Sequence, residues 1–260
     1  MSEGDTIFRT SVRLGEALEG KRVTESRLFR EARTLVEPGT VVRAVRSRGK
    51  HLLIFFEGDR ILHTHLGMTG AWRTYQAGED WRWSRARARV LIGTVEVLAV
   101  CFAAPIVEVF AERALRIHPS LSALGPDLCS PIVDLDAVVT RFSRLAPPEE
   151  EIGPLLLDQR IACGIGNVYK SEILFAERLD PFAPAGRISP SRIRDVYATA
   201  STLLRRNLRP GRRRTVAQGL AVYGRAPRPC LRCAQPIRAR RQGHPGRVTY
   251  WCLSCQPPIL

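Results

Sequence analysis

The sequence predicts an α+β fold built from more than one domain. Short β-rich runs occupy the chain up to about residue 110, helical periodicity follows beyond Pro119, and two Cys-x-x-Cys pairs stand near the C-terminus. With 260 residues, 45% of them hydrophobic, the chain is long enough for one large domain or two to three modest ones. We expect domains at residues 1–118, 119–215 and 216–260.

The N-terminal region is expected to start with a helix and to continue as an antiparallel β-sandwich or barrel. Gly20 would end the helix, which is marked by apolar residues near helical spacing: Ile7, Phe8, Val12, Leu14 and Leu18. Apolar runs separated by glycine-containing turns predict strands at residues 41–42, 51–56, 61–66, 90–92 and 95–101. Regular short strands of this kind are typical of a sandwich or a barrel.

The middle region is predicted to be helical. Apolar residues recur at three- and four-residue spacing over residues 135–145, 150–157, 168–179 and 190–208. Asp134 and Ser189 are suitable N-caps, and Pro190 would occupy the first position of the last helix.

The chain is strongly basic, with a net charge of +15 and a pI near 10.5. A surface this positive attracts polyanions, nucleic acid first and an acidic membrane second. No run of 18 apolar residues is present, and the N-terminus has neither the basic nor the apolar segment of a signal peptide. We therefore expect a soluble intracellular protein with no membrane partner.

Positive charge is concentrated toward the C-terminus. Residues 205–260 contain thirteen arginines and no Asp or Glu. A solvated basic tail is one interpretation. The segment also has the cysteine spacing of a metal site, however, and a folded basic module favours phosphate binding.

Two cysteine pairs form a specific zinc signature. Eighteen residues separate Cys230-x-x-Cys233 from Cys252-x-x-Cys255. Each pair presents two thiolates on one tight turn, and two turns complete a tetrahedron. Two redox pairs are the alternative, but the βαβ surroundings of such pairs are missing. Four thiolates leave no position for water, so we expect one structural Zn²⁺. Other residues with ligand chemistry are expected to be structural: Cys101, Cys129, Cys163, His63 and His65.

Further segments resemble the formamidopyrimidine-DNA glycosylase/endonuclease VIII family over essentially the whole chain. They are Ser2-Glu3-Gly4-Asp5-Thr6, Arg48-Gly49-Lys50-His51-Leu52-Leu53, Leu124-Gly125-Pro126-Asp127, and Leu157-Asp158-Gln159 leading to Gly164-Ile165-Gly166-Asn167. Each fragment alone is weak evidence for the family. Their order and spacing along the chain, ending in the two cysteine pairs, make the resemblance specific. The resemblance implies an N-terminal β-sandwich, a helix–two-turns–helix domain and a zinc ribbon. It also implies damaged double-stranded DNA bound between two lobes, with the lesion flipped into a pocket.

The resemblance implies catalysis by the chain's N-terminus. The α-amine of Ser2, exposed by removal of Met1, would attack the sugar C1′ and form a Schiff base that permits β-elimination. Glu3 would move protons to the sugar ring oxygen and from the amine. Lys50, expected to start a strand, would pair with a phosphate beside the lesion or protonate the leaving base.

The family's phosphate contacts are carried over to four further positions. Gly164 and Gly166 would form a tight turn that opens a helix, where free amides favour an anion. Asn167 and Arg247 would clamp the phosphates around the flipped nucleotide, and we count Arg247 with the catalytic set as well. Taken alone, Asn167 is more simply an N-cap. Glu172, in the same helix, matches a family acidic residue that faces the pocket.

Other segments bear on the lesion. Residues 65–70 resemble a loop that inserts an apolar side chain into the gap left by the flipped base, with Met68 as the wedge; a core methionine is the alternative. Residues 102–108 lack the Arg-Phe-Gly element of the 8-oxoguanine-directed branch, and Tyr250-Trp251 is similar to endonuclease VIII. These features favour oxidised pyrimidines.

Ser2 is the main departure from the family, whose usual residue there is proline. Serine offers a primary amine, which still forms an imine, so we expect glycosylase activity with a weaker lyase step. Two alternatives stay open: a lesion- or AP-site-binding protein that lacks part or all of the chemistry, and an RNA-binding zinc-ribbon protein. The resemblance also implies a monomer in the bacterial cytoplasm, associated with the nucleoid.

Overall fold

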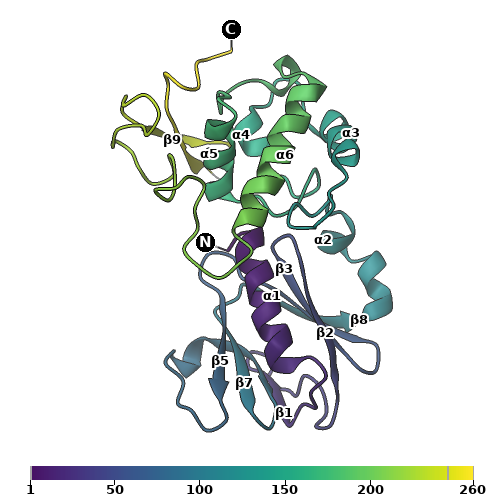
Figure 1. Cartoon of the computed structure of the whole chain (residues 1–260). Coiled ribbons are helices and arrows are strands. Elements are labelled where there is room, and N and C mark those ends of the chain that lie inside the picture. Colours follow the sequence, from purple (N-terminus) through teal and green to yellow (C-terminus); the bar gives the residue numbers. More distant parts are fainter. Residues whose placement is uncertain (1, 245, 260) are drawn as a thin grey trace. The chain divides into compact units, whose positions relative to one another are not determined.

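The chain folds into two compact units, residues 1–122 and 123–260, in a computed structural model that describes residues 2–244 and 246–259 (Figure 1). The division falls close to the boundary predicted at residue 118, while the domain bounds themselves and the further division at residue 215 stay predictions. None of the described helices combines the length and the apolar character that a bilayer crossing requires. The element order, strands first and helices after them, confirms the predicted α+β class.

The first unit contains one long helix and two four-stranded antiparallel sheets. The helix α1 spans Gly4–Leu18. One sheet has the order β1-β6-β7-β5, made of Glu25–Leu28, Ala88–Gly93, Val97–Phe102 and Ala71–Gln76. The other has the order β2-β3-β4-β8, made of Val42–Arg48, His51–Phe56, Arg60–His65 and Ile106–Ala111. Three short helical segments are also present: η1 (Arg85–Arg87), η2 (Glu112–Arg116) and α2 (Pro119–Ser122).

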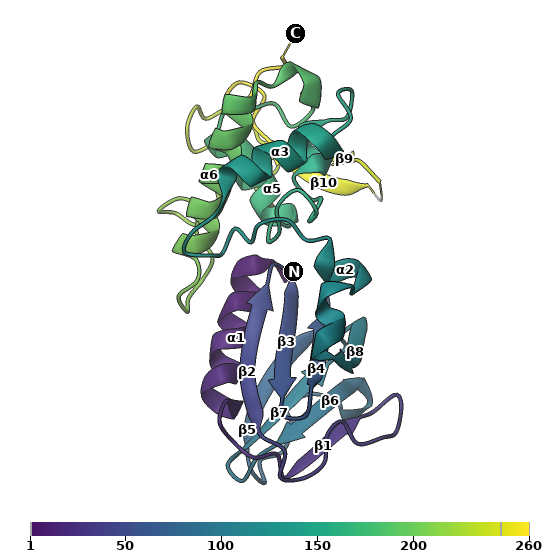
Figure 2. The same cartoon turned by 90° about the vertical axis from the view of Figure 1, so that its right-hand side faces the viewer.

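A shared hydrophobic core joins the two sheets. Leu52 and Ile54 of β3 belong to one buried cluster with Val90 and Ile92 of β6. The helix α1 contributes three buried residues to the same cluster: Ile7, Leu14 and Leu18. One face of each sheet is thus buried against a face of the other sheet. The unit is therefore a sandwich and not a barrel. α1 runs beside β2, at an edge of the sandwich (Figure 2).

Strand register brings three loops to one end of the sandwich. Arg48 pairs with His51, so residues 49–50 form a two-residue turn between β2 and β3. His51 pairs with His65, and His65 pairs with Ile106. The β4–β5 loop (residues 66–70) and the β7–β8 loop (residues 103–105) therefore lie at the same end as the β2–β3 turn.

The N-terminus reaches that end as well. Gly20, after α1, donates its amide to the carbonyl of Val42 at the start of β2, at 2.9 Å, so the helix runs back along the strand. The 15 residues of α1 and the seven of β2 have similar lengths, at about 1.5 Å and 3.3 Å per residue. The start of α1 and the β2–β3 turn lie at the same end of this unit (Figures 1 and 2).

Some predicted details of this unit are wrong. Val12 is 45% exposed, because it follows Ile7 by five residues and lies about 140° away from it around the helix. Val95, predicted to start a strand, is 80% exposed in the turn before β7. Three strands fall outside the predicted runs: β1, β5 and β8. β5 has the sequence Ala-Trp-Arg-Thr-Tyr-Gln, which contains no continuous apolar run.

The second unit is helical, with one hairpin. Its helices are α3 (Leu135–Leu145), α4 (Ile152–Leu155), α5 (Asn167–Ala176), η3 (Ala185–Arg187) and α6 (Pro190–Arg206). The hairpin joins β9 (Arg238–Gln242) to β10 (Arg247–Trp251). The predicted caps are confirmed: Asp134 accepts the amide of Ala137 at 2.9 Å, Ser189 accepts that of Arg192 at 3.3 Å, and Pro190 opens α6.

The helix predicted over residues 150–157 is a single turn, α4. The amides of Leu157 and Asp158 donate to carbonyls three residues earlier, at 2.9 and 3.1 Å, which tightens the chain and ends the helix. Residues 159–166 then turn into α5. This passage corresponds to the predicted helix–two-turns–helix.

Candidate active site and nucleic-acid interface

Glu3 occupies the N-cap position of α1. Its backbone is extended, and its carbonyl accepts the amides of Thr6 at 2.9 Å and Ile7 at 3.1 Å. Its side chain makes no capping hydrogen bond, and the residue is fully buried. A carboxylate held away from bulk water is a frequent feature of sites that transfer protons. Ser2, half-buried, lies directly before it.

Lys50 lies in the β2–β3 turn. The prediction that it starts a strand is wrong by one residue, because the pairing of Arg48 with His51 leaves Gly49 and Lys50 as the turn. Gly49 has φ +57, a conformation that such two-residue turns require and that glycine adopts without strain. The half-buried lysine is thus held at the end of the sandwich where α1 begins.

Met68 lies in the β4–β5 loop and is 64% exposed. The alternative of a core methionine is therefore wrong. Gly67 next to it has φ +56, and a Cβ there would lie 2.8 Å from Cγ of Pro105 in the β7–β8 loop. An exposed apolar side chain on a constrained turn is what insertion between bases requires.

Gln159 shapes the turn that leads into α5. Its Nε2 donates to the carbonyls of Leu157 and Ile165 at 2.7 and 3.1 Å, and its Oε1 accepts the amide of Gly164 at 3.0 Å. Gly164 has φ +118, which a side chain would strain. The predicted tight turn before a helix is confirmed, with Gly166 as the N-cap.

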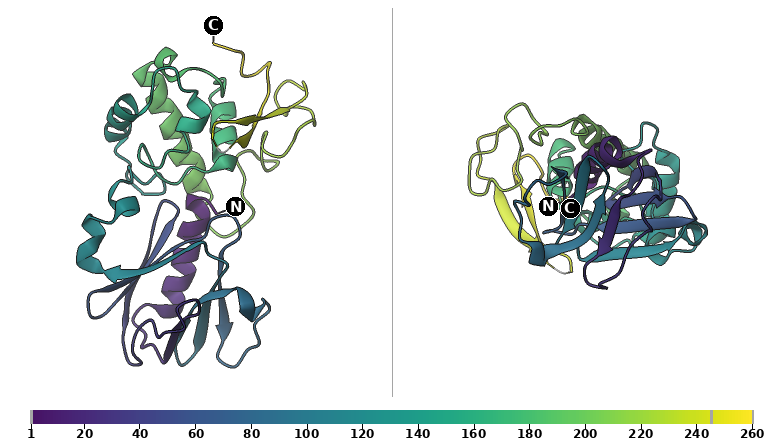
Figure 3. Two further views of the ribbon diagram at one scale, coloured as in Figure 1. Left: turned by 180° about the vertical axis from the view of Figure 1, so that it is seen from behind. Right: turned by 90° about the horizontal axis from the view of Figure 1, so that it is seen from below.

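One face of α5 is hydrogen-bonded to β10. Asn167 Nδ2 donates to the carbonyl of Val248 at 2.8 Å, and Lys170 Nζ donates to Thr249 Oγ1 at 2.7 Å. Ser171 Oγ accepts the amide of Tyr250 at 3.2 Å. Helix positions three and four residues apart share a face, so these contacts hold the hairpin against α5, and the two lie side by side in Figure 3.

Asn167 does not cap its helix, so the N-cap alternative is wrong. The residue is 6% exposed, and its Oδ1 is buried without a hydrogen-bond partner among residues 2–244 and 246–259. Its Nδ2 bond to Val248 places it next to Arg247, the half-buried first residue of β10. The structure thus brings together two residues predicted to act on neighbouring phosphates.

Glu172 is buried and organises the segment that follows α6. Its two carboxylate oxygens accept the amides of Ala221, Val222 and Tyr223 at 2.7, 2.9 and 2.8 Å. The hydroxyl of Thr215 also donates to this carboxylate. These bonds show that Glu172 positions the loop of residues 221–223. A direct contact between Glu172 and DNA stays a prediction.

The four C-terminal cysteines converge. Their sulfur atoms all lie within 4.8 Å of one another, with Cys230 3.9 Å from Cys255 and Cys233 3.4 Å from Cys252. A tetrahedral zinc with Zn–S bonds of about 2.3 Å places its sulfurs about 3.8 Å apart. The group is suited to hold a metal ion, as a zinc finger does.

A hydrogen-bonded chain of histidines lies on the sheet of β3, β4 and β8. His51 Nδ1 is 2.8 Å from His63 Nε2, and His63 Nδ1 is 2.7 Å from Glu108 Oε2. His118 Nε2 reaches the same carboxylate oxygen at 3.2 Å. Burial, followed by the charge of His63, lowers the pKa of His51 to about 3. The contacts support the structural role expected for His63.

Comparison with known proteins identifies the family. Residues 1–102 match the formamidopyrimidine-DNA glycosylase N-terminal domain, and residues 124–218 match its H2TH domain. A probable endonuclease 8 2 from Streptomyces coelicolor is 40% identical over 264 residues, which cover 98% of this chain and 94% of that protein. The chain belongs to the formamidopyrimidine-DNA glycosylase/endonuclease VIII family.

Other similar proteins cover the whole chain. The DNA-(apurinic or apyrimidinic site) lyase Nei2 of Mycolicibacterium smegmatis is 38% identical, covering 98% of this chain and 99% of that protein. The formamidopyrimidine-DNA glycosylase of Lactococcus lactis, solved with a DNA that contains N7-benzyl-Fapy-dG, superposes with a TM-score of 0.84. It is 18% identical and covers 98% and 100% of the two chains, so this likeness shows the fold. The family fold is thus confirmed.

Lys170 and Thr249 form a buried link between α5 and β10, and neither residue was predicted to have a role. The signal for Lys170 is its rarity, since the only lysines in the chain are Lys21, Lys50 and Lys170. A chain that uses arginine almost everywhere else retains lysine here, where it lies 1% exposed beside a threonine hydroxyl.

Proposed function

We propose that this protein is a base-excision-repair DNA glycosylase with AP lyase activity that removes oxidised pyrimidines from duplex DNA. The observation that carries the proposal is the burial of Glu3 directly after Ser2, at the sandwich end that also holds the Lys50 turn and the Met68 loop. The relationship to endonuclease 8 proteins over 98% of the chain supports it. The relative named as an AP lyase supports the lyase step.

The α-amine of Ser2, freed by removal of Met1, is the proposed nucleophile. An α-amine has a reference pKa of about 7.7–8.0, so a useful fraction is unprotonated near neutral pH. The positive end of the α1 dipole disfavours an ammonium group at this position. Nitrogen bonds to the deoxyribose C1′ as the glycosidic bond breaks, and the base leaves with the bonding electron pair. The C1′–O4′ bond then opens to give an imine, which permits β-elimination of the 3′-phosphate. Glu3 accepts the amine proton and donates to the ring oxygen.

Asn167 and Arg247 are proposed to hold the backbone phosphates around the lesion. The hydrogen bond from Asn167 to Val248 holds α5 against the strand that begins at Arg247. The Gln159-supported turn leads into the N-terminal end of α5, where the helix dipole favours an anion. Lys50 contributes a further phosphate contact, and Met68 fills the gap left by the flipped base.

One structural zinc ion is proposed to be held by Cys230, Cys233, Cys252 and Cys255. Its chemistry is that of a closed tetrahedral cross-link, which holds the arginine-bearing hairpin in place. The purified protein should contain one zinc per chain by elemental analysis, and Cys252→Ser should lose the zinc together with DNA binding. Cys129→Ala, a buried cysteine outside the ribbon, is the control that should retain one zinc.

The reaction is tested by base release and strand incision on duplexes that contain thymine glycol, 8-oxoguanine or an abasic site. We expect release of the oxidised pyrimidine and incision at the abasic site, with slower β-elimination than in the Ser2→Pro variant, whose secondary amine forms an iminium directly. Binding to all three duplexes without base release or incision would contradict the proposal.

Ser2 itself favours a second candidate function, a lesion-binding protein without catalysis. A primary amine on a small side chain is less rigidly placed than a proline nitrogen. Mass spectrometry of the intact protein separates the two candidates, because a retained Met1 leaves no free amine at residue 2.

A further inference from the structure

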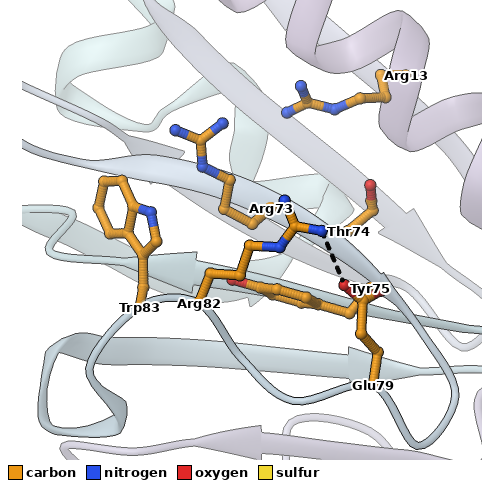
Figure 4. Close-up of a pocket in the computed structure, with 7 residues that line it drawn as sticks. All are labelled: Arg13, Arg73, Thr74, Tyr75, Glu79, Arg82 and Trp83. Atoms are coloured by element: carbon orange, nitrogen blue, oxygen red, sulfur yellow. Dashed lines mark ion pairs between the residues drawn. The ribbon is translucent and has the colours of Figure 1, made fainter.

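An arginine-rich pocket lies within the first unit, apart from the residues assigned to catalysis. It occupies about 430 Å³ between α1, β5 and the segment that leads from β5 back to β6 (Figure 4). Arg13 enters it from α1, Arg73 from β5, and Arg82 and Trp83 from that segment. Arg13 follows Glu3 by ten residues, which corresponds to roughly 15 Å along the helix axis.

The positive charge of the pocket exceeds its negative charge. Glu79 is the carboxylate in its lining, and it pairs with Arg82 at 3.6 Å. Among the described residues, no carboxylate makes an ion pair with Arg13 or Arg73. Burial, and then the charge of Arg73, lower the pKa of the Arg13 guanidinium, so the two groups repel each other. An anion between them would relieve that repulsion.

Tyr75 supplies a hydrogen-bond donor that the protein itself does not use. The residue is 5% exposed, and its hydroxyl is buried without a partner among residues 2–244 and 246–259. Its ring is stacked on Trp81 at 6.4 Å, which fixes its direction. The hydroxyl end points toward Arg82 and Trp83 (Figure 4). An unsatisfied buried hydroxyl costs free energy, which a ligand oxygen would recover.

The aromatic rings in this region are already covered by arginines. The guanidinium groups of Arg73 and Arg87 lie 5.1 and 5.4 Å from the Trp83 ring. Arg85 lies 4.9 Å from the Trp81 ring. Cation–π contacts of this kind hold guanidinium groups in fixed positions and leave their N–H edges free to donate. The surface is therefore suited to an anion and offers little ring area for stacking a base.

We propose that this pocket binds a phosphate group through Arg13, Arg73, Arg82 and the hydroxyl of Tyr75. Planar guanidinium groups match the geometry of phosphate oxygens, and a tyrosine hydroxyl donates a charge-assisted hydrogen bond to the same anion. The phosphate belongs either to a DNA backbone that extends away from the lesion or to a free phosphate compound. The site does not depend on the catalytic assignment of Ser2 and Glu3.

The test is calorimetric titration of the full-length protein with inorganic phosphate and, separately, with an undamaged 20-base-pair duplex, at constant ionic strength. Tyr75→Phe keeps the ring and removes the hydroxyl, and Arg73→Gln removes one guanidinium. Tyr197→Phe, which removes an equally buried hydroxyl in the second unit, is the matched control. Chemical unfolding in chloride buffer should show Tyr75→Phe to be at least as stable as the wild type.

We expect phosphate to bind roughly tenfold more weakly to Tyr75→Phe, as the loss of one hydrogen bond to a charged group implies, and still more weakly to Arg73→Gln. Tyr197→Phe should match the wild type. A parallel loss of duplex affinity identifies a DNA phosphate as the ligand, and unchanged duplex affinity identifies a free phosphate. Equal phosphate and duplex binding by the wild type, Tyr75→Phe and Arg73→Gln would overturn the proposal, as would no binding of either ligand by the wild type.

Discussion

The side chain of Glu3 is a carboxylate enclosed at the start of a helix. Many carboxylates before a helix accept its first amides, but this one makes no such bond and is fully buried. Its neighbour in the chain is the proposed nucleophile. A carboxylate held away from bulk water beside a reacting amine is suited to move protons, which is the role proposed for Glu3.

Glu3→Gln keeps the size of the side chain and removes its acid–base chemistry. We expect the single-turnover rate of base release to fall by roughly 10²- to 10⁴-fold, the usual contribution of general acid–base catalysis, with little change in DNA affinity. Glu16→Gln, on the exposed face of the same helix, should behave as the wild type. A Glu3→Gln enzyme that releases base at the wild-type rate would remove Glu3 from the mechanism.

Polar contacts join the elements of the second unit. These contacts leave no sign in the apolar periodicity of the sequence. The helix α5 presents Asn167, Lys170 and Ser171 to β10, and its Glu172 holds the loop of residues 221–223. Buried polar contacts of this kind hold the segments that they join in fixed positions. The helix is therefore the scaffold to which the hairpin and the loop are attached.

Glu172→Gln tests that scaffold. In the wild type, backbone N–H groups donate to both carboxylate oxygens of Glu172. The glutamine side chain would place an NH₂ group opposite some of these donors. We therefore expect the free energy of unfolding to fall by about 1–3 kcal/mol from the broken hydrogen bonds. Amide hydrogen exchange should become faster at Ala221, Val222 and Tyr223. Glu149→Gln, an exposed substitution, is the control. Unchanged protection of those three amides would show that the carboxylate does not hold the loop.

The sequence predicted elements whose pattern is local. Helical spacing and caps placed α3 and α6, and the cysteine spacing placed the ribbon, because each signal lies within a few residues. The strand β5 was not predicted, because its residues are buried by a distant part of the chain. The loop that contains Trp81 and Trp83 packs over one face of its sheet. The hydrogen bond between Asn167 and Val248 was not predicted either, because it joins residues 81 positions apart in the sequence. Contacts of that range leave no periodic trace in one sequence.

In the whole molecule, each unit has its own core and carries its own part of the proposed site. The first unit holds Ser2, Glu3, Lys50 and Met68, and the second holds Asn167, Arg247 and the cysteine ribbon. The net charge of +15 gives both units a general attraction to DNA. Under the proposed function, recognition of the lesion itself is assigned to these few side chains, because charge alone attracts any DNA.

The histidine chain in the first unit is expected to make the stability of the folded protein depend on pH. Burial lowers the pKa of His51 to about 3, and it lowers the pKa of His63 as well. The unfolded chain therefore takes up protons below about pH 6.5 while the folded state does not, so stability is full above that pH and declines as pH falls from 6.5 toward 3. Urea unfolding from pH 8 to pH 4.5 should show this decline, with a shallower slope for His51→Gln and the wild-type slope for the exposed His244→Gln. A stability that is flat across this range would contradict the assignment.

The proposed reaction requires that the amine of residue 2 bonds to the sugar of the damaged nucleotide. Borohydride reduction of the protein with a duplex that contains an abasic site, followed by peptide mapping of the adduct by mass spectrometry, tests it most directly. We expect one reduced adduct, with the deoxyribose carbon on the α-nitrogen of Ser2 in a chain that lacks Met1. An adduct on Lys50 or Lys170, or none while the duplex stays bound, would contradict it.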